Sequence, residues 1–190
     1  MKKIFKQGLT LIELMTVVSM IMIVTAIVFT TYGIGRDSMA LERSSQKLYQ
    51  DIRFAINNSM SGLDGYSGAG IHFDKSGSGS TTKYIIFKNP LSPVSQTFDG
   101  NSVNIFPSKG VTVSDWLSLE EGVKIASFTN ASGGTSDTSL NAYFGSPYPT
   151  TYLNGTYYQN RATVSIVLST NDGSKTKTIT IYSSGMIDVR

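Results

Sequence analysis

Residues 8–29 read GLTLIELMTVVSMIMIVTAIVF, and this stretch decides how the chain begins to fold. Between Lys6 and Arg36 the only charged residue is Glu13. The 19 apolar-rich residues from 14 to 32 would span about 28 Å as an α-helix, close to the roughly 30 Å of a bilayer core. The sequence therefore predicts one membrane-spanning helix near the N-terminus.

The charge distribution predicts the orientation of that helix. Lys2, Lys3 and Lys6 precede it, and basic residues before a membrane helix favour a cytoplasmic N-terminus. The rest of the chain is then expected outside the cytoplasm. Without these three lysines, 13 basic side chains face 13 acidic ones, so composition alone does not favour nucleic-acid binding, which depends on neutralising phosphates.

Glu13 needs an explanation, because a carboxylate near the membrane core costs at least about 2.5 kcal/mol and usually has a partner or a role. A cleaved signal peptide or a plain signal anchor is expected to give it neither. A signal peptidase would also require small residues in an A-x-A pattern, which residues 25–27 and 31–33 fit poorly. Glu13 therefore weighs against both interpretations.

The motif GLTLIEL at residues 8–14 resembles the processing and methylation motif of type IV prepilins and pseudopilins. In that family a peptidase cuts after the glycine. The resemblance implies that Gly8 ends a leader, that Leu9 becomes the N-methylated first residue, and that Glu13 pairs with the free amine of a neighbouring subunit. The family more often has Phe at the position of Leu9. Such a pairing agrees with the cost of leaving a charge unpaired in an apolar filament core.

The chain beyond the membrane segment is expected to continue as an amphipathic helix and then to form strands. Gly33 and Gly35 each weaken a helix by about 1 kcal/mol relative to Ala, which predicts a bend or a melted turn there. Apolar residues then recur with helical spacing to a predicted helix end near residues 60–62. The predicted strands are Gly70–Phe73, Lys83–Lys88, Val103–Phe106, Val123–Phe128, Ala162–Ser169, Lys177–Tyr182 and Met186–Val189, with a hairpin turn at 171–174.

These elements predict an α+β, pilin-like fold, in which a long N-terminal helix packs on a C-terminal antiparallel β-sheet domain. The expected divisions are a leader at 1–8, a transmembrane and filament-core helix at 9–32, an amphipathic helix at 33–62 and a β-rich domain at 63–190. The pattern resembles the GspH/FimT-like branch of minor pilins and pseudopilins. The resemblance rests on residues 43–57, 70–74, 119–125, 144–145 and 179–189.

The resemblance implies a structural subunit of a type IV pilus or a type II secretion filament, not an enzyme. Its partners would be other pilins or pseudopilins, a prepilin peptidase and an inner-membrane assembly platform. It would be held in the inner membrane by a single helix, with its domain outside, before it enters the filament. The alternative is a competence-type minor pilin that binds DNA directly at a filament tip. The candidate cations for that binding are Lys175, Lys177 and Arg190, near the last hairpin and the C-terminal end.

The segment from 141 to 158 is rich in tyrosine, including Tyr148, Tyr152 and Tyr157. Tyrosine supplies contact area at low entropic cost, so these residues, together with Lys175 and Lys177, are a possible ligand surface. The same tyrosines equally fit the covering of a small sheet core. The sequence leaves both interpretations open.

Other chemistry finds little support in the sequence. The chain has no cysteine, which excludes disulfides and thiolate metal sites, and no metal or cofactor motif is apparent. His72 is the only histidine, so a Ser-His-Asp triad would have to be built around it alone. A membrane-anchored enzyme is therefore the weakest alternative. Trp116 is expected to pack against the sheet.

Overall fold

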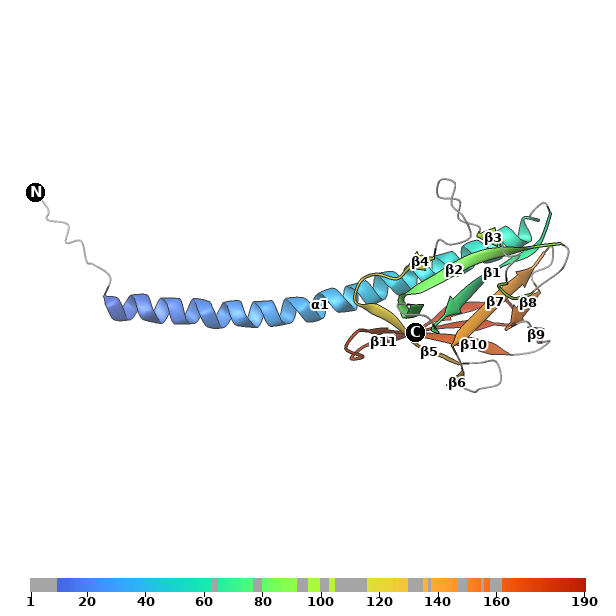
Figure 1. The fold of residues 1–190 in the computed structure, drawn as a ribbon. Helices are drawn as coiled ribbons and strands as arrows, with labels where there is room; N and C mark the ends of the chain where they lie inside the picture. The colour runs from blue at the N-terminus through green and yellow to red at the C-terminus, as the bar shows by residue number, and fades with distance from the viewer. Residues whose placement is uncertain are drawn as a thin grey trace, which may run out of the picture. The chain divides into compact units, whose positions relative to one another are not determined.

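The computed structural model describes residues 10–62, 65–76, 80–91, 96–99, 103–104, 116–129, 135–136, 138–146, 150–154, 156–157 and 162–190. Contacts divide the chain into two compact units, Met1–Asp37 and Ser38–Arg190. We call the second one the globular unit. Figure 1 labels the helix and most of the strands.

Helix α1 runs from Leu11 to Met60 and is continuous over 50 residues. It stays helical through Gly33 and Gly35, so the expectation of a melted turn is wrong. The physical reason is that glycine keeps its backbone N–H, so each glycine costs only about 1 kcal/mol and the helical hydrogen bonds can continue. A capping residue or a lost donor would be needed to end the helix there.

The described strands form two antiparallel sheets, which makes the fold α+β. The first sheet has the order β3-β2-β1-β7-β8-β9, with β4 also paired to β2, and the second has the order β12-β11-β10-β5-β6. A short 3₁₀ helix, η1 (Ser80–Thr82), precedes β2. The strands are β1 (Tyr66–Asp74), β2 (Lys83–Pro90), β3 (Val103–Asn104), β4 (Leu117–Ser118), β5 (Val123–Thr129), β6 (Thr135–Ser136), β7 (Ser139–Gly145), β8 (Thr151–Leu153), β9 (Thr156–Tyr157), β10 (Thr163–Thr170), β11 (Thr176–Tyr182) and β12 (Ile187–Val189).

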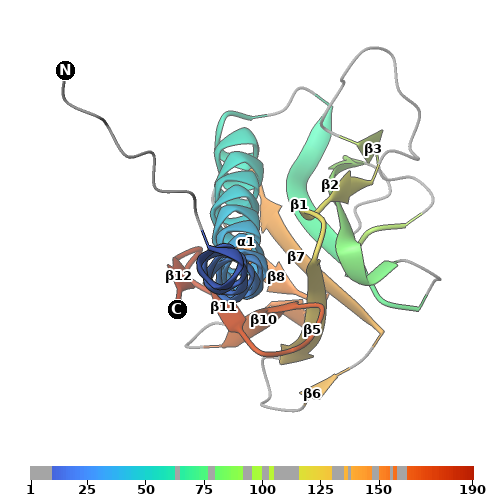
Figure 2. The ribbon, with the colours of Figure 1, turned by 90° about the vertical axis from the view of Figure 1, so that its left-hand side faces the viewer.

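The core of the globular unit lies between the later part of α1 and both sheets (Figure 2). Leu41, Leu48, Ile52 and Ala55 recur with helical spacing on α1 and are buried. They belong to one cluster with alternate residues of the strands, so the expected packing of the amphipathic helix on sheet is confirmed. The sheet residues of this cluster include Ala69, Ile71, Phe73, Tyr84, Ile86, Ala142, Phe144, Val164, Ile166, Leu168, Ile179 and Ile181.

The hairpin predicted at residues 171–174 is confirmed between β10 and β11. Asp172 Oδ1 accepts hydrogen bonds from the Thr170 hydroxyl and from the backbone N–H of Ser174. These donors hold the pKa of Asp172 at about 2. Gly173 has a φ of 73°, a left-handed conformation that glycine adopts without steric cost.

The strand predictions hold where the structure describes them, but they missed β7, β8 and β9, as well as the two-residue strands β4 and β6. Strand β7 lies inside the first sheet, between β1 and β8. Of the predicted strand at 103–106, only Val103 and Asn104 fall among the described residues.

Polar contacts also join α1 to the sheets within the globular unit. The Ser59 hydroxyl is buried, 2.7 Å from the Phe144 carbonyl oxygen and 2.8 Å from that of Gly145. The Tyr84 hydroxyl on β2 donates to Asp51 Oδ2 on α1. These contacts fix the helix against the strands by directional bonds as well as by apolar packing.

Candidate functional site

The start of α1 is held by a reciprocal pair of hydrogen bonds between Thr10 and Glu13. The Thr10 backbone N–H and hydroxyl each donate to Glu13 Oε2 at 3.0 Å. The Glu13 backbone N–H donates to Thr10 Oγ1 at 3.3 Å. This is a capping box, in which a Thr before the first turn and a Glu three residues later satisfy each other's backbone donors.

The cap gives Glu13 a role that the sequence analysis missed. The signal was present as Thr10-Leu11-Ile12-Glu13, the T-x-x-E pattern of a capping box. The expectation that a plain anchor would offer Glu13 no role is therefore wrong. A carboxylate at the start of a helix caps it and is also stabilised by the positive end of the helix dipole. Glu13 alone therefore does not distinguish a prepilin from a plain anchor or a signal peptide. The motif at residues 8–14 is the feature that favours a prepilin.

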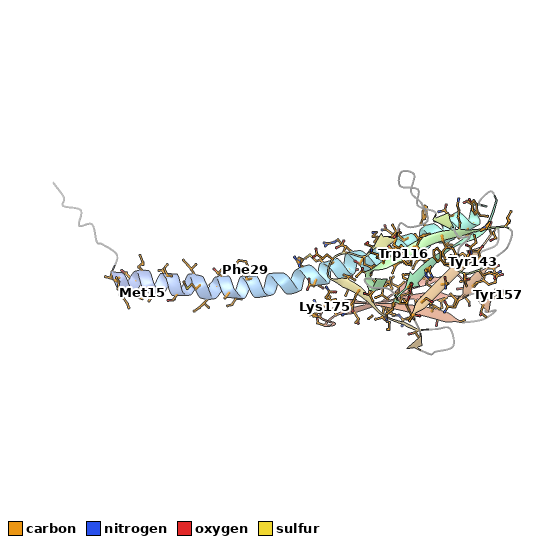
Figure 3. All side chains as sticks on the ribbon, viewed as in Figure 1. Met15, Phe29, Trp116, Tyr143, Tyr157 and Lys175 are labelled. Atoms are coloured by element: carbon orange, nitrogen blue, oxygen red, sulfur yellow. The ribbon has the colours of Figure 1, made fainter. Side chains whose placement is uncertain are left out.

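The segment Leu11–Phe29 of α1 is long and apolar enough to cross a membrane. Its side chains are exposed throughout within its own unit, from 42% for Val18 to 78% for Leu11. Figure 3 shows Met15 and Phe29 projecting from the helix. Such a surface is stable only when lipid or other apolar helices cover it.

The polar side chains of this segment are satisfied within the helix. The hydroxyls of Thr16, Ser19 and Thr25 donate to the carbonyl oxygens of Glu13, Met15 and Ile21 at 2.9, 2.8 and 2.7 Å. Because unsatisfied polar groups are costly in hydrocarbon, these bonds make the segment compatible with an apolar environment.

The predicted processing residues Gly8 and Leu9 lie outside the described residues, as does Tyr148. Tyr152 and Tyr157 lie directly opposite each other on β8 and β9. Their ring centroids are 5.7 Å apart. The structure therefore brings two of the three predicted tyrosines together.

The two predicted lysines lie elsewhere in the globular unit. Lys175 immediately precedes β11 and Lys177 lies on it, with Lys177 Nζ 3.0 Å from Glu42 Oε2 on α1. Figure 3 shows Lys175 and Tyr157 at opposite ends of the globular unit. Tyr157 and Lys175 thus do not belong to one ligand surface.

No known protein family, curated protein or solved structure matches this chain. The candidate sites are therefore interpreted from their own geometry.

His72 and Trp116 take part in packing on the first sheet. The His72 Nδ1 atom is 2.8 Å from Asn141 Oδ1. Its ring stacks on Phe98 at 4.8 Å and lies 5.7 Å from the ring of half-buried Trp116. Burial lowers the pKa of His72, while Asn141 and Asp74 act in the opposite direction. These contacts account for the histidine as part of an aromatic cluster.

Proposed function

We propose that the chain is a pilin-like filament subunit, a minor pilin or pseudopilin of a type IV pilus or a type II secretion filament. The observation that carries the proposal is that the GLTLIEL motif at residues 8–14 leads directly into the exposed apolar segment Leu11–Phe29. The motif supplies a cleavage and methylation signal, and the helix supplies a surface that needs covering. A filament core of packed helices meets that need once the subunit leaves the membrane.

Cleavage between Gly8 and Leu9 would also create the partner that Glu13 requires in such a core. The new amine at Leu9 carries a positive charge, and a neighbouring subunit's Glu13 carries a negative one. Their pairing offsets the cost of burying either charge alone. The partners that follow are other pilins or pseudopilins, a prepilin peptidase and an inner-membrane assembly platform.

The proposed location follows from the same features. Lys2, Lys3 and Lys6 favour a cytoplasmic N-terminus, so the globular unit would lie outside the cytoplasm, anchored in the inner membrane by α1 before assembly. Direct DNA capture has less support. Of its three candidate cations, Lys177 is already paired with Glu42 and Arg190 with Asp188.

Intact mass of the full chain, extracted from membranes after coexpression with a prepilin peptidase, tests the proposal. We expect a mass that begins at Leu9 and carries one added methyl group. A Gly8→Ala variant should keep its leader, because the residue before the cut is changed. A wild-type chain that stays uncut, or one cut near Thr31, would leave a plain anchor or a signal peptide instead.

A further inference from the structure

A row of residues crosses the outer face of the first sheet at right angles to its strands. Phe87 on β2 lies opposite Gly70 on β1, and Gly70 lies opposite Tyr143 on β7. Tyr143 in turn lies opposite Tyr152 on β8, and Tyr152 lies opposite Tyr157 on β9. Directly opposite side chains project to the same face of a sheet. We call Phe87, Tyr143, Tyr152 and Tyr157 the aromatic row.

The aromatic row is on the face away from the main core. On β1 and β7 the residues on either side of the row, such as Ile71 and Ala142, belong to the core cluster, and on β8 Leu153 does. Since successive side chains of a strand point to opposite faces, the row points the other way. It is a second apolar feature of this sheet.

The absence of a side chain at Gly70 lets the rings of Phe87 and Tyr143 meet across β1. A Cβ atom at Gly70 would lie 2.8 Å from Phe87 Cζ, so the Phe87 ring occupies the space over the glycine. The Phe87 and Tyr143 rings thereby stack, with centroids 6.1 Å apart and an interplanar angle of 21°. The Tyr143 and Tyr152 rings follow at 6.0 Å, which makes the row continuous up to Tyr157.

Exposure rises along the row from one end to the other. Phe87 and Tyr143 are buried, Tyr152 is half-buried and Tyr157 is 49% exposed. The Tyr143 hydroxyl is 2.6 Å from Ser67 Oγ, which fixes the buried end. Two accessible rings are therefore presented on a rigid base, and such preorganisation lowers the entropic cost of binding.

The strands that carry the exposed rings are uncharged. Strands β7, β8 and β9 contain no Asp, Glu, Lys, Arg or His. Their polar side chains are the hydroxyls and amides of Ser, Thr, Tyr and Asn. A polyanion such as nucleic acid needs basic groups, so these strands suit a neutral ligand with hydroxyls to hydrogen-bond.

The aromatic rings indicate that the neutral ligand is a sugar. The face of an aromatic ring carries partial negative charge, which attracts the partly positive C–H groups on one side of a sugar ring. A protein partner fits less well, because a standard interface buries about 800 Å² on each side. The exposed rings stand on strands of only three and two residues, which also offer little edge for strand addition.

We propose that Tyr152 and Tyr157 form a binding site for a neutral carbohydrate, with the C–H face of one sugar ring stacked on Tyr157. The site is independent of processing at Gly8 and of filament assembly. In a filament subunit it would add recognition of an uncharged glycan surface.

A glycan array carrying neutral oligosaccharides of glucose, galactose and mannose beside acidic glycans tests this site. The full chain is held in a detergent without a sugar headgroup, because alkyl glycosides would compete for the tyrosines. We expect binding to neutral glycans. Removal of the ring in Tyr157→Ala should weaken that binding by about tenfold, whereas Tyr157→Phe, which keeps the ring, should retain most of it.

Met186→Ala is the matched control, since Met186 is 57% exposed and lies just before β12 of the second sheet. It should bind as the wild type does. The proposal is overturned if no neutral glycan binds, if only acidic glycans bind, or if Tyr157→Ala binds unchanged while its unfolding midpoint matches the wild type. The mass experiment on Gly8 is unaffected by any of these results, so the two proposals fail separately.

Discussion

Thr10 and Glu13 each donate a backbone N–H to the other's side chain, at 3.0 and 3.3 Å, just where α1 begins. One carboxylate therefore caps the helix of its own subunit. In the proposed filament the same carboxylate also faces the amine of a neighbour. The two roles depend on different properties of Glu13, because the cap needs an acceptor oxygen and the pairing needs a charge. Substitutions can separate them.

Thr10→Val removes the cap and leaves the charge. Loss of a Thr cap typically costs about 1 kcal/mol, which corresponds to a roughly fivefold larger open population of the first turn. We expect hydrogen–deuterium exchange at the amides of Glu13 and Leu14, which donate to the side chain and the carbonyl oxygen of Thr10, to accelerate by that factor in the detergent-solubilised chain. Thr25→Val is the control, since the Thr25 hydroxyl bonds only to the Ile21 carbonyl in mid-helix. Equal exchange in both variants would show that the cap does not hold the helix start.

Glu13→Gln removes the charge and leaves the cap, because glutamine also serves as the third residue of a capping box. We expect normal exchange at the first turn and normal cleavage after Gly8, but loss of filaments in sheared fractions viewed by electron microscopy. The reason is that the neighbour's buried amine would have no counter-charge. Filaments at wild-type abundance would contradict the proposed pairing.

The sequence predicted those parts of the fold whose signals are local. The alternation of Val164, Ile166 and Leu168 with polar residues predicted β10, and the turn after it predicted the hairpin. Strand β7 was missed because both its faces are buried, with Phe144 in the core and Tyr143 in the aromatic row. Its neighbour β1 is far away in the sequence, so no local pattern indicates the pairing.

The candidate sites likewise divide into those with a local sequence signal and those that depend on strand pairing. The motif at residues 8–14 is contiguous and was visible in the sequence, and so was the T-x-x-E cap, although the cap was overlooked. The aromatic row could not be predicted, because it depends on the register of five strands that sets Phe87 opposite Gly70 and Tyr157 opposite Tyr152. A shift of one residue in any pairing would turn one of these rings to the other face.

Asp51 predicts a pH dependence of stability in the globular unit. Burial raises the pKa of Asp51, while the Tyr84 hydroxyl and the nearby Lys47 act to lower it. The folded state thus holds this proton more tightly than the unfolded state does. The carboxyl group favours folding most at pH values below its ordinary pKa of about 4, and this contribution is lost as pH rises through the raised value.

Asp51→Asn removes this titration and keeps an acceptor oxygen for Tyr84. We expect the free energy of unfolding of the variant, relative to that of the wild type, to increase as pH rises from about 4 to 7. Denaturant unfolding of the full chain in detergent, followed by fluorescence of Trp116, the single tryptophan, measures it.

Asp172→Asn provides a comparison of opposite sign. The folded-state pKa of Asp172 is lowered to about 2. The free energy of unfolding of the wild type, relative to that of this variant, should therefore increase as pH rises from about 2 to 4. If the free energies of unfolding of the two variants changed with pH in the same direction relative to the wild type, the environment of Asp51 would not be the cause of the change in its variant.

Gly70→Ala tests the packing under the aromatic row. The added Cβ would lie 2.7 Å from the Ala142 carbonyl oxygen and 2.8 Å from Phe87 Cζ. Neither neighbour can move freely, because Ala142 belongs to the paired strand β7 and Phe87 is fully buried. Overpacking of this kind costs about 1–3 kcal/mol, so we expect a lower denaturant midpoint in the Trp116 assay.

Gly145→Ala on β7 separates this steric effect from the general effect of placing alanine in a strand. Its added Cβ would meet nothing closer than 3.5 Å, an ordinary van der Waals contact, so its stability should stay within about 0.5 kcal/mol of the wild type. Strand preference favours alanine over glycine at both sites, and a loss confined to Gly70→Ala is therefore steric. Equal stability of the two variants would mean that Phe87 can leave the space over Gly70, and the rigid base inferred for Tyr152 and Tyr157 would be lost with it.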